Sequence, residues 1–173
     1  MSNTGITETR IREVVAQCLN YVGILTDKCV LRIYNCKNVS NAHYAGVYVF
    51  FDESTIYYVG EADDIARRLS REHCAVHIGG SEGVVRFLMY YLDHICDLRA
   101  EWERLSVRDR EEFVKGVLRR LIHGLGIFVV MCDDLKDEVH GGKRVRSRLE
   151  ECLIEKLNPV LNPNKGVGDF IPV

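Results

Sequence analysis

The sequence predicts one domain of mixed α/β (α+β) class, with a small central β-sheet flanked by several helices. Three observations predict this class: amphipathic helical periodicity in several segments, two short aromatic strands around a polar turn, and one continuous apolar run at 127–132. A run of this kind is typical of a strand that is buried on both faces. The 173 residues can bury a sizeable core, and no repeat or linker divides them. We therefore expect a single domain over residues 1–173.

In the first half of the chain, the apolar residues of segment 7–22 recur at helical spacing, which predicts an N-terminal helix that ends near Gly23. A strand is expected at 29–36. Residues 46–51 and 56–61 are expected to pair as a hairpin, because β-branched and aromatic residues flank a polar turn. Asp63 or Asp64 can cap the short helix that follows.

The second half begins with a helical insertion at about 84–122, in which Ser106 and Asp109 resemble a capping box. The apolar run 127–132 supplies a buried third strand. A last helix is expected to end at Asn158, because the residue before Pro159 disfavours the helical conformation.

Charge and cysteine content argue against some classes of protein. The formal net charge of −2 does not indicate nucleic-acid binding, and the local basic clusters are by themselves more typical of solvated helix faces. The seven cysteines form no CxxC pair, which argues against a zinc site and a thiol-redox protein. We expect most of them to be small buried residues, with a Cys29–Cys36 bridge as an alternative.

With no signal peptide and no apolar span, a cytoplasmic protein without membrane contact is expected.

Three short motifs and one arginine stand at informative spacing. Gly46-Val47-Tyr48 and Tyr58-Val59-Gly60 lie on the two hairpin strands, Arg68 follows eight residues after Gly60, and the segment 148–162 contains a glutamate, an apolar pair, a proline and an asparagine. Together they resemble the GIY-YIG nuclease superfamily, most closely its type II restriction endonuclease branch. The resemblance covers residues 46–162.

The resemblance implies a DNA endonuclease that requires one divalent cation, Mg²⁺ with Mn²⁺ as a possible substitute. Glu150 would be the metal ligand and Asn162 a supporting polar residue, while Arg68 would neutralise the phosphate. Tyr48 would be the general base or would position the water, with Tyr58 hydrogen-bonding nearby. Helix geometry also favours Glu150 over its neighbour Glu151, because Glu150 shares a face with apolar residues of the last helix.

His73 is the other candidate base, or the group that takes the phenol proton. It follows Arg68 by five residues where four is commoner in the family, so a bulge in the helix would be needed, and His77 is a second possibility. The acidic stretch 61–64 could cap the helix or weaken DNA affinity. Phosphate contacts are expected from nearby basic residues, namely Arg67, Arg71, Lys143, Arg144 and Arg146.

The expected function is restriction-like cleavage of both DNA strands by a homodimer, for which the insertion at 84–122 would supply dimer or DNA contacts. A structure-specific repair or recombination nuclease is an alternative within the same class. A DNA-binding module that keeps the fold without catalysis is the alternative from another class.

Overall fold

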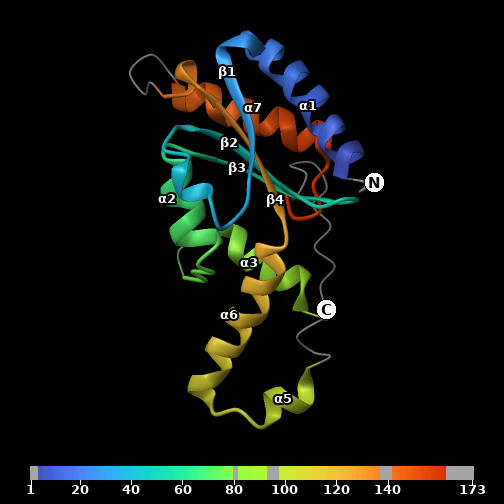
Figure 1. The fold of residues 1–173 in the computed structure, drawn as a ribbon, viewed down its shortest axis with the longest axis vertical. Coiled ribbons are helices and arrows are strands. Elements are labelled where there is room, and N and C mark those ends of the chain that lie inside the picture. Colours follow the sequence, from blue (N-terminus) through green and yellow to red (C-terminus); the bar gives the residue numbers. More distant parts are fainter. Residues whose placement is uncertain (1–3, 80–81, 93–97, 137–141, 163–173) are drawn as a thin grey trace.

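The computed structural model describes residues 4–79, 82–92, 98–136 and 142–162, which form a four-stranded antiparallel sheet with helices on both faces (Figure 1). The strands lie in the order β1-β4-β2-β3. Their bounds are Cys29–Tyr34 for β1, Gly46–Phe51 for β2, Ile56–Ala62 for β3 and Gly126–Cys132 for β4. The predicted α+β class, the hairpin β2–β3 and the buried strand β4 are confirmed.

The helices form two layers because side chains alternate along the strands. Val47, Val49 and Phe51 of β2 face a core that is covered by α1 (Thr4–Tyr21) and α7 (Gly142–Leu157). Tyr48 and Phe50 face the opposite core, which also contains residues of three other helices. These are α2 (Ile65–Arg68), α3 (Glu82–Tyr90) and α6 (Val107–His123).

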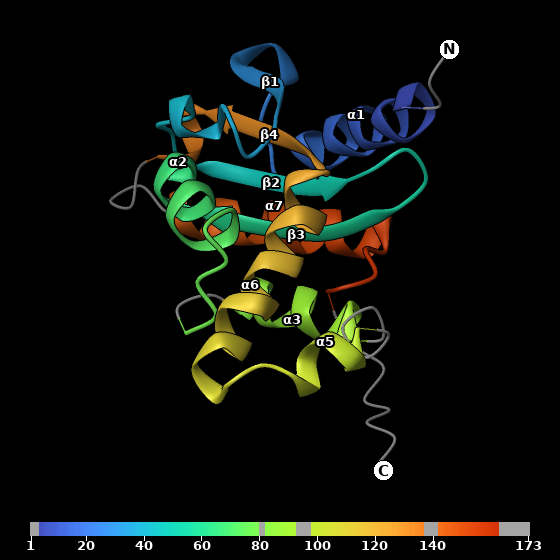
Figure 2. The same ribbon diagram turned by 60° about the horizontal axis from the view of Figure 1, so that its bottom comes forward.

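The predicted insertion at 84–122 contains α3, the short helix α5 (Arg99–Glu103) and α6. The fully buried residues of α6 all lie in its C-terminal half. Its N-terminal half and α5 extend away from the sheet, as Figure 2 shows. None of the helices in the described ranges is long and apolar enough to cross a membrane.

The helix boundaries follow the predicted capping signals. Asp64 accepts a hydrogen bond from the backbone N–H of Arg67 at 3.0 Å, so Asp64 rather than Asp63 caps α2. Ser106 accepts a bond from the N–H of Asp109 at the start of α6. Asn158 follows α7 with φ of 50°, in the left-handed region where a helix stops.

Three disulfides form among the described residues, and the Cys29–Cys36 bridge that was the alternative expectation is wrong. Cys29 instead bonds Cys132 across β1 and β4, and Cys36 bonds Cys74. The reason is geometric: β1 is extended from Cys29 to Tyr34, roughly 17 Å, whereas bridged Cα atoms lie within about 7 Å. A third bridge, Cys18–Cys152, joins α1 to α7, and Cys96 lies outside the described residues.

Six bridged cysteines bear on the expected cytoplasmic location. Disulfides persist in oxidising compartments and are rare in reducing cytosol, with hyperthermophiles as the exception. Because an ordinary reducing cytosol would keep these cysteines as thiols, the expected cytoplasmic location stays a prediction.

Candidate active site

The two hairpin tyrosines lie on one face of the sheet. Tyr48 pairs with Gly60 across β2 and β3, and Tyr58 pairs with Phe50, which places both phenols in the same layer with ring centroids 6.3 Å apart. Tyr48 is only 2% exposed. A Cβ atom at Gly60 would lie 2.6 Å from the Tyr48 hydroxyl oxygen. The glycine of the second motif is therefore needed so that the Tyr48 ring can lie across β3.

A π-helical turn, Leu69–His73, follows α2 and carries His73 to Tyr48. Its wider hydrogen-bonding is visible in the bond from the N–H of Cys74 to the carbonyl of Leu69, five residues earlier, at 2.8 Å. This turn is the bulge that the five-residue spacing requires, and such turns recur at functional sites. His73 Nε2 lies 3.0 Å from the Tyr48 hydroxyl, whereas the alternative His77 is exposed.

His73 is uncharged at neutral pH. Burial, followed by the nearby Arg68 guanidinium, lowers its pKa to about 3. Its Nδ1 is buried and has no hydrogen-bond partner in the described part of the chain. An unpaired buried N–H is rarer than an unpaired acceptor, so we assign the proton to Nε2. In this tautomer His73 donates to the Tyr48 oxygen, and Nε2 cannot take the phenol proton.

Both tyrosines are protonated at neutral pH. Burial raises the pKa of Tyr48 well above its usual value, the neighbouring Tyr58 raises it further, and Arg68 opposes the change. The pKa of Tyr58 is raised to about 12 by burial and then by the Glu150 carboxylate. A phenol in this setting needs an additional positive charge nearby before it can act as a base.

Arg68 sits at the end of α2 with Glu72 as its partner, at 2.5 Å. Glu72 also forms an ion pair with Arg67 at 3.1 Å, and Arg67 forms a second ion pair with Asp63. The Arg68 Nε is buried and has no partner among the described residues. Sequence reasoning missed Glu72, although its i+4 spacing from Arg68 was a usable signal.

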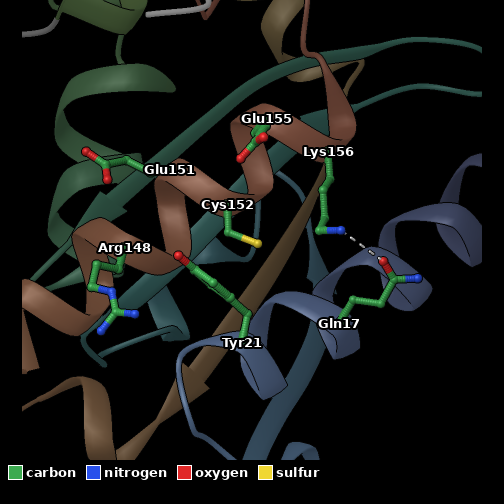
Figure 3. A pocket seen from close by; sticks show the side chains of 7 residues that line it. All are labelled: Gln17, Tyr21, Arg148, Glu151, Cys152, Glu155 and Lys156. Atoms are coloured by element: carbon green, nitrogen blue, oxygen red, sulfur yellow. Dashed lines mark hydrogen bonds between the residues drawn. The ribbon is translucent and has the colours of Figure 1, made fainter.

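Glu150 reaches the site from α7. It is half-buried beside Leu149 and Leu153, which are fully buried, and its carboxylate is close enough to raise the pKa of both tyrosines. The predicted core-side position of Glu150 agrees with this placement. Glu151 lies on another face of the helix, where it lines a separate cavity of about 450 Å³ between α1 and α7 (Figure 3).

Asn162 is 8% exposed, and its side chain binds the backbone of the edge strand β3. Its Oδ1 accepts from the backbone N–H of Val59 at 2.7 Å, and its Nδ2 donates to the Val59 carbonyl at 2.9 Å. The side chain thus acts as a strand partner for the residue next to Tyr58. Its observed contacts make Asn162 a positioning residue.

The predicted phosphate-binding residues separate into two groups. Arg146 is 2% exposed and pairs with Glu61 at 2.7 Å, which argues against the expected contact with DNA. Its guanidinium neutralises a carboxylate of the acidic stretch 61–64. Arg71 and Arg144 are exposed, while the side chain of Lys143 lies outside the described part of the structure.

Two residues of α3 complete the surroundings of the tyrosines, and no motif in the sequence indicated them. Gly83 packs against His73, and a Cβ there would lie 3.2 Å from the Tyr58 ring. The Arg86 guanidinium lies 6.0 Å from the centroid of the same ring.

Comparison of the chain with protein-family models, with curated proteins and with solved structures found no match. Within the described residues no three His, Cys, Asp or Glu side chains gather as a metal-binding group. The carboxylate that acts on both tyrosines is Glu150, while Glu72 acts on Tyr48 and Glu82 on Tyr58. A hard oxygen donor of this kind fits Mg²⁺, which usually keeps several waters and takes one or two carboxylates.

Proposed function

We propose that the protein is a divalent-metal-dependent nuclease that hydrolyses phosphodiester bonds in DNA. The observation that supports this proposal best is the convergence at Tyr48. Its hydroxyl lies 3.0 Å from His73 Nε2, and Arg68 and Glu150 are both close enough to shift its pKa. These residues come from β2, the π-helical turn, α2 and α7, so only the folded chain brings them together.

The division of roles follows from the chemistry of each side chain. Arg68 would hold the phosphate, because a guanidinium stays charged and offers several donors. Glu150 would hold Mg²⁺ or Mn²⁺, which when bound supplies positive charge at the phosphate and assists the leaving oxygen. Tyr58 would hydrogen-bond beside Tyr48.

As a phenolate, formed by release of its own proton to bulk water, Tyr48 would position the attacking water and accept its proton. The phenol is a poor base while its pKa is raised, so its activation depends on positive charge from Arg68 and the bound cation. His73 donates through Nε2 to the same oxygen and would stabilise the phenolate that forms. The role of His73 is therefore orientation and charge stabilisation at Tyr48.

The restriction-like form of the activity, with a homodimer that cuts both strands, follows from the family resemblance. Exposed Arg71 and Arg144 are the candidates for phosphate contacts outside the cluster. Linear products from a circular plasmid, together with a dimeric mass in solution, would support this form. Activity restricted to branched DNA would support the repair-type alternative.

The decisive experiment compares plasmid cleavage in Mg²⁺, Mn²⁺ and EDTA for the wild type, Glu150→Gln and Glu151→Gln. We expect metal-dependent cleavage that Glu150→Gln abolishes and Glu151→Gln preserves, since the two neighbours lie on different faces of α7. Equal activity of the Glu150 variant would remove this residue from the mechanism. If the wild type cuts no plasmid, branched or single-stranded DNA, the non-catalytic DNA-binding module becomes the better description.

A further inference from the structure

Arg86 approaches the tyrosine cluster from α3, a helix that lies outside the three sequence motifs. Its guanidinium carbon lies 6.0 Å from the centroid of the Tyr58 ring. The charge of Arg86 lowers the pKa of Tyr58 more than the charge of Arg68 does. The Tyr58 hydroxyl is therefore influenced by two arginines that come from different helices.

The contacts of Arg86 fix its position relative to Tyr58. Its Nη1 donates to the carbonyl of Leu161 at 3.1 Å, and Leu161 precedes Asn162, which binds Val59 on both backbone groups. The N–H of Leu161 in turn donates to the carbonyl of Tyr57 at 2.9 Å. The guanidinium and Tyr58 are thus held by the same edge of the sheet.

Arg86 also forms an ion pair with Glu82, one helical turn earlier. The side chain of Arg86 is 24% exposed and that of Glu82 is 76% exposed, so the carboxylate is mostly in water and its hold on the guanidinium is weak. A guanidinium has five N–H donors, and these two contacts leave several of them for a further acceptor. Phosphate oxygens suit such a fork better than a single carboxylate oxygen does.

We propose that Arg86 binds a phosphate oxygen of the nucleic-acid strand beside Tyr58, and that Glu82 occupies the guanidinium until the phosphate displaces it. This inference rests on the proposed function, because it takes a phosphodiester backbone as the ligand. It assigns to α3 a direct part in substrate binding, in addition to the packing of Gly83 against His73. Arg68 has a similar arrangement, because it also forms an ion pair with a glutamate of its own helical segment.

The test measures binding of a labelled DNA duplex in EDTA by fluorescence anisotropy over a range of salt concentrations. Arg86→Gln should weaken binding about tenfold and reduce the salt-dependence slope by about 0.9, the contribution of one phosphate contact. Glu82→Gln should strengthen binding about threefold. Opposite signs for the two partners distinguish phosphate binding from a structural ion pair, whose loss would act in the same direction from either side.

Arg12 and Glu8 on α1 provide a matched control. They form an ion pair with the same spacing at 2.8 Å, and the Arg12 guanidinium lies 5.0 Å from the Phe128 ring, but α1 covers the opposite core. Arg12→Gln and Glu8→Gln should change affinity less than about twofold. Thermal melts identify any variant that is misfolded, and Glu82→Gln tests the proposal even if Arg86→Gln does not fold.

The outcomes separate this inference from the nuclease assignment. If the wild type binds and cuts DNA while Arg86→Gln and Glu82→Gln leave affinity and salt slope unchanged, the inference is wrong and the nuclease stands. The inference is also wrong if both variants shift affinity in the same direction. Opposite shifts in a protein that does not cut would support the Arg86 site on a binding module. A wild type that binds no DNA overturns both proposals.

Discussion

Acidification should destabilise the protein through His73 well before the carboxylates are protonated. The pKa of this histidine is about 3 in the folded chain, whereas the usual value of 6.5 applies in the unfolded chain. Between these values the unfolded chain binds a proton that the folded chain does not, so stability falls as the pH falls below 6.5. Above pH 6.5 both states are neutral and the burial of His73 adds no pH dependence.

The size of the effect follows from these two values. Each pH unit inside the window corresponds to about 1.4 kcal/mol, so acidification from pH 7.5 to 5.0 should remove about 2 kcal/mol of unfolding free energy through His73 alone. Asp52 and Asp63 do not contribute in this range, because their hydrogen bonds outweigh burial and lower their pKa below 3.8.

Urea unfolding at pH 7.5 and 5.0 under oxidising conditions measures this loss. Wild type should lose about 2 kcal/mol more than His73→Gln, because glutamine fills a similar volume and does not titrate. His77→Gln serves as the control, since His77 is exposed and should leave the wild-type loss unchanged. Equal losses in wild type and His73→Gln would refute the assignment of a buried, neutral His73.

Three further substitutions test other parts of the structure. Gly60→Ala places a methyl group 2.6 Å from the Tyr48 hydroxyl, and thermal denaturation should show a loss of about 1–3 kcal/mol; unchanged stability would mean that Tyr48 does not lie across β3. Removing the bridge of Cys36 and Cys74, which are 38 residues apart, with a double serine variant should cost about 4 kcal/mol in urea unfolding, and insensitivity would argue that the two thiols are not bonded. Arg146→Ala should cost about 3–5 kcal/mol because it leaves Glu61 half-buried and unpaired, whereas the exposed Arg144→Ala should be nearly neutral; equal effects would contradict the buried pair.

Local patterns in the sequence were sufficient for the elements and for much of the candidate site. The apolar spacing of α1 and α7 predicted both helices and the core-side face of Glu150, because the helical period is a property of consecutive residues. The aromatic and β-branched runs around a polar turn predicted β2 and β3, and with them the shared face of Tyr48 and Tyr58. Capping by Asp64 and Ser106 was also readable, since a cap involves residues only three positions apart.

The sequence by itself therefore determined the fold class, the hairpin that carries the tyrosines and the side of α7 that meets them. Only the tertiary structure decided which distant groups became partners: Cys18 with Cys152 across 134 residues, Arg146 with Glu61 across 85, and Arg86 with Tyr58. It also decided that a π-helical turn, instead of a regular α-helix, would place His73 on Tyr48. The physical reason is the same in each case, because short-range periodicity specifies which face a residue occupies, whereas packing of the layers selects the group that it meets there.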